Sequence, residues 1–259
     1  MSAGRSLQER LSRKRGLIGF LQTHPNLELA EMAGMCGCDF LLLDGEHGVF
    51  AERDYLQTLQ VLAAVNVLAM VRLRNHDAQA LGRYMDMGAD VIVVPNVTTA
   101  EQARVLVRAM DYPPAGTRGF GASLHRGTRY GIDVASHLKS PREGASLLVI
   151  IEAALGVANA DDILAVDGVD GVIVGPFDLA ADLGVAGEFA QPAYAQAVGH
   201  VERAAAAKGK ILGTAPYPGS PVESLLARGH RLLIVGADMS LMREAMSAAV
   251  AKASYCLEN

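Results

Sequence analysis

Two acidic residues, Glu152 and Asp178, each follow a short apolar run that is rich in β-branched residues. Glu152 comes directly after 147–151, and Asp178 comes shortly after 172–174. Such runs between helical segments are typical of buried parallel strands, and α/β folds gather their chemistry at the carboxyl ends of these strands. Two carboxylates at this edge suit a divalent cation such as Mg²⁺ or Mn²⁺. The alternative for each acid is a simple cap on the helix that follows it.

Further ionisable residues follow two other apolar runs. Arg72 comes directly after 68–71, and Asp44, Glu46 and His47 come after 40–43. A guanidinium at this edge suits a carboxylate, a keto oxygen or a developing enolate, although it could instead neutralise Asp44 or Glu46. A histidine flanked by acids can have its tautomer fixed, which makes it a candidate general acid or base.

A long segment, 111–146, breaks the regular order of the chain and is rich in Gly, Pro and Arg, with one short helix expected at 133–139. Loops of this length are typical of lids, binding loops or subunit contacts. His125 and Arg126 within it are candidates for contact with the far end of a substrate. Asp86 ends an expected helix, where the helix dipole disfavours an anion, so we expect a cationic or protic partner for it.

The elements that must position these residues alternate along the whole chain, which we interpret as one domain over 1–259. The expected strands are 17–21, 40–43, 68–71, 91–94, 147–151, 172–174, 211–213 and 232–235, and the expected helices are 26–35, 51–64, 77–87, 100–110, 156–165, 193–208, 221–228 and 239–253. This pattern predicts an α/β fold, a TIM (β/α)₈ barrel. A doubly wound sheet would favour a Gly-rich turn after the first strand, which 20–25 lacks.

Composition excludes several functional classes. The chain has 259 residues and a formal net charge of -5, which leaves no basic surplus for nucleic acid. Its apolar runs are too short to cross a membrane, and only three cysteines occur, so we expect a reducing, cytoplasmic location. None of the lysines falls where a Schiff-base aldolase would need one, which favours a metal over an imine for stabilising a carbanion.

Four motifs resemble those of the HpcH/HpaI aldolases: 41–48 (LLLDGEHG), 112–119 (YPPAGTRG), 151–152 (IE) and 175–179 (GPFDL). The resemblance covers nearly the whole chain. It implies a metal-dependent, class II pyruvate aldolase with a TIM barrel. It also implies a homo-oligomer, typically a hexamer, in which the C-terminal helix is exchanged between subunits.

The resemblance also implies individual roles. Glu152 and Asp178 would bind Mg²⁺ or Mn²⁺, with Co²⁺ or Zn²⁺ as further options, and Arg72 would hold the 2-oxo group. His47 would act as acid or base, oriented by Asp44 and Asp86. The substrate carboxylate would meet the backbone of Gly175, Pro176, Phe177 and Asp178. The bulky Phe177 and the sequence at 74–76 depart from the usual pattern, so the aldehyde is not predicted.

The predicted function is reversible aldol cleavage of a 4-hydroxy-2-oxo acid into pyruvate and an aldehyde. Its small-molecule partners are then the hydroxy-oxo acid, pyruvate and the aldehyde. One alternative is a lyase of the citrate lyase or malyl-CoA lyase type, for which Arg118, Arg126 and Arg129 would offer a basic surface to the thioester. The other alternative is a barrel that binds keto acids without catalysis.

Overall fold

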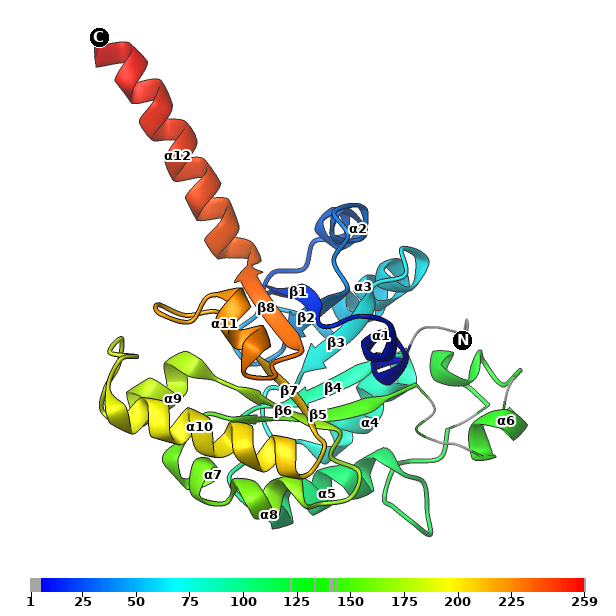
Figure 1. The fold of residues 1–259 in the computed structure, drawn as a ribbon. Helices are drawn as coiled ribbons and strands as arrows, with labels where there is room; N and C mark the ends of the chain where they lie inside the picture. Colours follow the sequence, from blue (N-terminus) through cyan, green and yellow to red (C-terminus); the bar gives the residue numbers. More distant parts are fainter. Residues whose placement is uncertain (1–5, 122, 133, 140–141, 143, 259) are drawn as a thin grey trace.

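The computed structural model describes residues 6–121, 123–132, 134–139, 142 and 144–258. Within these residues eight parallel strands close into a barrel, paired in chain order (Figure 1). The strands are β1 (Leu17–Gln22), β2 (Phe40–Asp44), β3 (Leu68–Arg72), β4 (Val91–Val94), β5 (Ser146–Ile151), β6 (Gly171–Val174), β7 (Ile211–Thr214) and β8 (Leu232–Ala237). The predicted TIM barrel and its eight strands are confirmed.

Helices cover the outside of the barrel. They are α1 (Leu7–Arg13), α2 (Leu27–Met35), α3 (Glu52–Ala64), α4 (Ala78–Met87), α5 (Ala100–Met110), α6 (Val134–Lys139), α7 (Ala154–Ala158), α8 (Ala160–Leu164), α9 (Pro176–Asp182), α10 (Pro192–Ala207), α11 (Val222–Ala227) and α12 (Asp238–Glu258), with a 3₁₀ turn, η1, at Arg126–Thr128. The helix expected at 156–165 is wrong in detail, because Asn159 divides it into α7 and α8 and donates from its amide to the carbonyl of Thr98.

Alternate residues of the strands β2 to β7 face two different cores. Leu41 and Leu43 of β2 pack outward against the helices, whereas Phe40 and Leu42 fill the barrel interior. Burial on both faces explains why the strands read as continuous apolar runs instead of alternating ones. Helix α1, which was not expected, packs Leu7 against the interior residues at the amino ends of the strands. The opposite, carboxyl end of the barrel carries the polar residues.

Local capping interactions fix several helix ends. The carboxylate of Asp77 accepts from the first backbone amides of α4, and Gly88 ends that helix in the left-handed region with φ 91°. Thr99 and Gln102 form a reciprocal capping box at the start of α5. These bonds satisfy amides that a helix start leaves unpaired, and they set where α4 and α5 leave the carboxyl rim.

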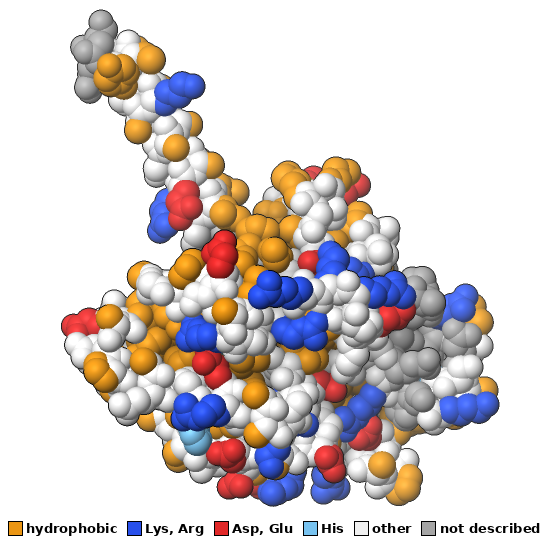
Figure 2. Space-filling view, viewed as in Figure 1, with side chains coloured by type: hydrophobic (Ala, Val, Ile, Leu, Met, Phe, Trp, Pro, Cys, Tyr) orange, Lys and Arg blue, Asp and Glu red, His pale blue; other side chains and the backbone are white. Residues whose placement is uncertain are grey.

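Helix α12 projects away from the barrel (Figure 1) and touches it only near its first residues, against β8 and β1. Its surface carries apolar side chains along its length (Figure 2): Met239, Leu241, Met242, Met246, Val250, Tyr255 and Leu257 are all exposed. Among the described residues, no helix combines the length and the apolar character that crossing a membrane would need.

Candidate active site

A cavity of about 480 Å³ opens at the carboxyl ends of the strands. Its ionisable lining residues include His47, Arg72, Glu152 and Asp178, which come from the ends of β2, β3, β5 and β6. The structure therefore brings together residues that lie far apart in the sequence. Much of the remaining wall is apolar. A mostly apolar cavity with a few convergent charged groups is typical of a small-molecule site.

Arg72 is held by two acids at the end of the preceding strand, β2. Its Nε and Nη2 donate to the two oxygens of Asp44 at 2.8 and 2.7 Å, and Nη1 lies 2.9 Å from Oε2 of Glu46. The guanidinium is nearly buried and Asp44 is fully buried. A guanidinium has five N–H donors, so these three contacts leave two for a ligand. Arg72 is thus fixed in orientation and still able to bind an oxygen.

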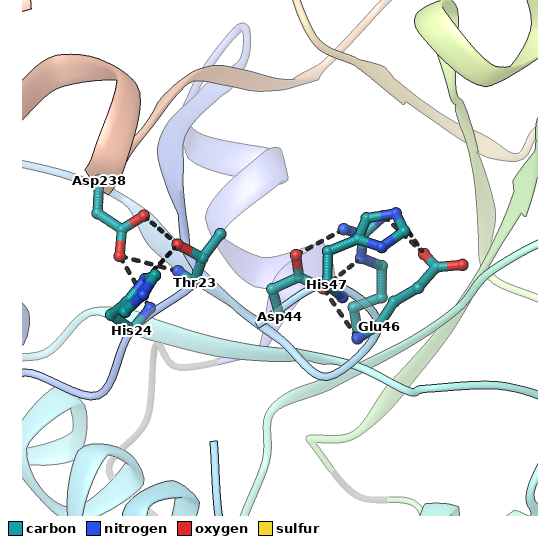
Figure 3. A network of polar contacts seen from close by, with 7 residues as sticks. Thr23, His24, Asp44, Glu46, His47 and Asp238 are labelled. Carbon is teal, nitrogen blue, oxygen red and sulfur yellow. Dashed lines mark hydrogen bonds and ion pairs between the residues drawn. The ribbon is translucent and has the colours of Figure 1, made fainter. Parts of the chain in front are cut away.

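A tight turn at 44–48 carries His47 to the edge of the cavity. Oδ1 of Asp44 accepts from the backbone amides of Glu46 and His47 at 3.0 and 3.3 Å. Gly48 is needed here, because a Cβ at this position would lie 2.2 Å from the Asp44 carbonyl oxygen. The His47 ring is exposed, and its Nε2 lies 3.9 Å from Oε2 of Glu46 (Figure 3). Asp44 therefore positions the backbone of His47, whereas the imidazole ring lies beside the carboxylate of Glu46.

Glu152 is 8 % exposed and accepts a 2.7 Å hydrogen bond from the backbone amide of Asn96, at the end of β4. Burial, with the nearby charge of Glu46 and then that of Asp178, raises the pKa of Glu152 to about 7. Gly175 makes room for this carboxyl group, since a Cβ at 175 would lie 2.6 Å from its Oε2. The Glu152 side chain thus bonds to the end of β4 instead of capping the helix that follows it.

Asp178 stands in the first turn of α9, a helix that was not expected and that begins at Pro176 directly after β6. With Glu152 it offers two hard oxygen ligands to the same cavity, next to a buried carboxyl group whose charge is unfavourable without a cation. This donor set fits a divalent metal ion. The described residues contain no group of three or more His, Cys, Asp or Glu side chains placed to hold a metal. Water and substrate oxygens would complete the coordination shell.

Asp86 is not brought to this cavity. Its carboxylate lies 2.5 Å from Nη2 of Arg118 and 3.4 Å from Nε2 of His125, so it has the cationic and protic partners that were expected. Asp86, His125 and Arg126 instead line a separate cavity of about 530 Å³ on the side of the barrel. Within one chain, Asp86 therefore does not reach His47, and His125 and Arg126 do not reach the active-site cavity. Their proposed roles stay predictions.

The basic loop surface expected for a thioester is wrong for Arg118, one of its three residues, because this side chain is buried. The Arg118 side chain is 2 % exposed and pairs with Asp86. Arg126 donates from Nη1 to the carbonyl of Met87, at the end of α4. Both guanidinium groups therefore fasten the long loop to the barrel, and the surface that favoured a thioester substrate is reduced to Arg126 and Arg129.

Sequence reasoning missed several residues of the site. The hydrogen bond from the backbone amide of Asn96 to Glu152 could not be predicted from the sequence, because any residue could supply such an amide. Ser240 and Glu244 line the cavity from the start of α12, and only the direction of that helix brings them there. The sequence offered the contact between Glu46 and Arg72 only as an alternative to substrate binding by Arg72. The structure shows this contact at the ends of two neighbouring strands.

Comparisons with known proteins agree with this geometry. A model of the HpcH/HpaI aldolase/citrate lyase family matches residues 19–245. A hydroxypyruvate/pyruvate aldolase of Delftia acidovorans is 38 % identical over 216 residues, which is 83 % of this chain and 80 % of the relative. A 2-keto-3-deoxy-L-rhamnonate aldolase of Klebsiella pneumoniae is 35 % identical over 239 residues, 90 % of this chain and 89 % of the relative.

The solved structures give the same result. A HpcH/HpaI aldolase/citrate lyase family protein from Burkholderia cenocepacia superimposes with a TM-score of 0.89 and 28 % identity, over 96 % of this chain and 99 % of that one. The sequence match covers most of the barrel, including every strand end that lines the cavity. The chain belongs to the HpcH/HpaI aldolase/citrate lyase family.

Proposed function

We propose that this protein catalyses the reversible aldol cleavage of a 4-hydroxy-2-oxo acid into pyruvate and an aldehyde, and so is a carbon–carbon lyase. The observation that carries the proposal is the cavity in which Arg72, with two N–H donors left, stands beside Glu152 and Asp178. The names of the Delftia and Klebsiella relatives describe aldolases, which supports the same reaction class.

The proposed cofactor is a divalent metal, Mg²⁺ or Mn²⁺, with Co²⁺ or Zn²⁺ as further options, held by Glu152 and Asp178. The raised pKa of Glu152 and the space that Gly175 leaves beside its carboxylate support this assignment. When bound, such an ion polarises the keto group of the substrate as a Lewis acid. The substrate oxygens and water take the positions that two carboxylates leave open.

In the synthetic direction His47, acting as the base, takes a proton from the methyl group of pyruvate, and the electron pair of that C–H bond moves through C2 onto the C2 oxygen to form an enolate. Arg72 donates to that oxygen and stabilises the developing charge. The enolate carbon attacks the aldehyde carbonyl, a C–C bond forms, and His47 gives a proton to the new alkoxide. In the cleavage direction the same groups act in reverse, with His47 removing the hydroxyl proton.

The substrate carboxylate meets the start of α9 in this proposal. The first amides of a helix have no partner within the helix, and those of Phe177 and Asp178 follow directly after Gly175 and Pro176. All four residues line the cavity. Asp86 could join His47 only across a subunit boundary, because it lies elsewhere in one chain.

We further propose that the protein is a homo-oligomer, a hexamer, in which α12 packs on a neighbouring subunit. The support is the exposed apolar surface of α12 and its projection away from its own barrel. An apolar helix surface of this length is typical of an interface. The reducing cytoplasm is the proposed location, which agrees with free Cys36 and Cys38.

The direct test is release of pyruvate from a 4-hydroxy-2-oxo acid, followed with and without a chelator. Asp178→Ala should abolish the metal-dependent rate, and calorimetry should show loss of Mn²⁺ affinity. Asp162→Ala, which removes an exposed carboxylate from α8, is the matched control and should change neither. Unchanged turnover and Mn²⁺ affinity in Asp178→Ala would show that the ligand assignment is wrong.

A further inference from the structure

The active-site cavity has two chemically different walls. One wall carries Arg72, Glu152 and Asp178. The other is apolar and consists of side chains from β1, β7, β8 and α9: Leu21, Ala215, Pro216, Ile234, Ala237 and Phe177. Pyruvate is small, and its carboxylate and keto oxygens both belong at the polar wall. The apolar wall is therefore left for the second substrate, the aldehyde.

Phe177 is the largest side chain of this apolar wall, and it is 57 % exposed although it lines the cavity. Its ring meets Phe189 edge to face, with centroids 5.5 Å apart and an interplanar angle of 87°. Phe189 in turn packs on Tyr217 at 5.0 Å and on the buried Tyr194 at 5.3 Å. We call these four residues the aromatic ledge.

The ledge is supported from behind. Nη2 of Arg228 donates to the hydroxyl of Tyr217 at 3.1 Å, and Tyr194 is 1 % exposed. A ring that is packed on a fixed partner loses little freedom when a ligand contacts it, so Phe177 can present a preformed apolar surface. Aromatic rings favour edge-to-face or offset contact with another ring. The exposed ring of Phe177 can therefore make such a contact with an aromatic ligand.

The charges of the cavity point in the same direction. Among its described lining residues Arg72 is the one arginine or lysine, and it is already paired with Asp44 and Glu46. The acids are Glu152, Asp178 and, at the rim, Glu244, whose Oε1 lies 3.4 Å from the Arg243 guanidinium on the surface. In the proposed reaction pyruvate engages Arg72 and the metal ion held by Glu152 and Asp178. No lining arginine or lysine is then left to receive a second carboxylate or a phosphate on the aldehyde.

We propose that the acceptor is an uncharged aldehyde with an apolar, aromatic substituent, and that Phe177 is the residue that determines this specificity. The inference rests on the proposed aldol reaction and names the substrate class for its second half. The aldehyde carbonyl faces the polar wall, where the enolate attacks it, and the substituent lies against Phe177.

Three aldehydes separate charge from apolarity in a synthesis assay with pyruvate. Benzaldehyde and 4-carboxybenzaldehyde share a ring and differ by one charge, whereas glycolaldehyde is neutral and polar. We expect benzaldehyde to exceed each of the others in kcat/KM by about tenfold or more, the effect of one favourable ring contact or one unmatched charge. Preference for 4-carboxybenzaldehyde or for glycolaldehyde would overturn the inference.

Variants assign the effect to Phe177. Phe177→Ala should lower the ratio of benzaldehyde to glycolaldehyde kcat/KM by about tenfold, and Phe177→Leu, which keeps an apolar side chain, by less. Phe120→Ala is the matched control, because Phe120 is 61 % exposed and lies in the long loop outside the cavity. Its ratio should stay at the wild-type value. An unchanged ratio in Phe177→Ala would contradict the assignment.

Failure of the inference can be told from failure of the proposed function. Binding of 4-fluorobenzaldehyde, followed by ¹⁹F line broadening, reports on the apolar wall without any chemistry. Binding that weakens in Phe177→Ala and not in Phe120→Ala supports the inference even if no aldol product forms. Aldol product with other aldehydes but no binding of 4-fluorobenzaldehyde would leave the proposed reaction standing and remove the aromatic acceptor.

Discussion

Arg72 links stability to the proposed catalysis, because the same guanidinium that lines the cavity also neutralises a fully buried carboxylate, Asp44. Losing one member of a buried ion pair leaves the other charged in an apolar environment. A mutation here should therefore affect both folding and turnover. The two effects can be measured separately, by unfolding and by steady-state kinetics.

Arg72→Ala should lower the free energy of unfolding by about 3 to 5 kcal/mol, the usual cost of breaking a buried pair. It should also reduce kcat/KM by about a hundredfold or more, since a charge stabiliser is lost. Urea unfolding and steady-state kinetics measure the two effects. Arg72→Lys keeps the charge but loses the two-point contact, so it should recover part of the stability. Wild-type kcat/KM in Arg72→Ala would remove this residue from the site.

Glu152 makes stability depend on pH in a defined direction. Its pKa is raised from 4.5 to about 7 in the folded protein. Between these values the folded state keeps a proton that the unfolded state has released, so the stability of metal-free protein should fall as pH rises across this window. Urea unfolding after chelator treatment, at pH about 5, 6 and 7, measures the slope.

The control for this prediction is Glu152→Gln, which should have a smaller slope, whereas Glu223→Gln on the exposed face of α11 should keep it. A divalent ion binds the ionised carboxylate, so added Mg²⁺ should stabilise the wild type more at pH about 8 than at pH about 5. A wild-type slope in Glu152→Gln would contradict the assigned pKa shift.

Most of the polar wall could be predicted from the sequence because each residue follows an apolar strand. Glu152, Asp178, Arg72 and His47 all meet in one cavity for this reason. Asp86 could not be placed in the same way, since it ends a helix. A helix that returns along the outside of the barrel carries its last residues away from the carboxyl rim.

At the scale of elements, the junction between β6 and α9 leaves the space that the proposed metal site needs. Gly175 is the residue between them, and a Cβ there would lie 2.6 Å from Oε2 and 2.8 Å from Cβ of Glu152. Gly175→Ala should therefore displace the Glu152 carboxylate and weaken Mn²⁺ binding by at least about tenfold, as changes around a metal site commonly do. Calorimetric titration with Mn²⁺ measures this.

Gly119→Ala is the matched control for Gly175→Ala. A Cβ at 119 would meet no atom within 4 Å, so Mn²⁺ affinity should stay at the wild-type value. Equal affinities in the wild type and in Gly175→Ala would mean that Glu152 does not bind the ion in this orientation.

The elements that sequence patterns missed are short ones. Helix α9 spans seven residues and begins at a proline that follows the strand almost at once, so it offers too few residues for a helical period. Helix α1 is equally short, and its position depends on Leu7 and Leu11 packing into the barrel. The strands were predicted correctly from their continuous apolar runs, and the long amphipathic helices because their period extends over several turns.

For the whole molecule, α12 is the feature that one chain does not explain. Met246 on this helix is 62 % exposed, and its apolar neighbours are exposed as well. The regular β-α order predicted the closed barrel, but no pattern within one chain tells where such a helix docks. Its docking place therefore stays a prediction of the proposed oligomer.

Met246→Glu should break the proposed assembly, because a charge at the buried centre of an apolar contact is unfavourable. Light scattering after size exclusion should give several times the mass of one chain for the wild type and a smaller mass for the variant. Gln60→Glu, on the exposed side of α3, adds the same charge elsewhere and should leave the mass unchanged. A monomeric wild type would contradict the exchange of α12.

The central claim is that this cavity converts pyruvate into its enolate with the help of a divalent metal. Proton NMR of pyruvate in D₂O with the enzyme tests it most directly, because exchange of the methyl protons reports enolate formation without requiring the right aldehyde. We expect exchange that stops on addition of EDTA and returns with Mg²⁺ or Mn²⁺. No exchange with any divalent metal, or exchange that EDTA does not affect, would contradict the account.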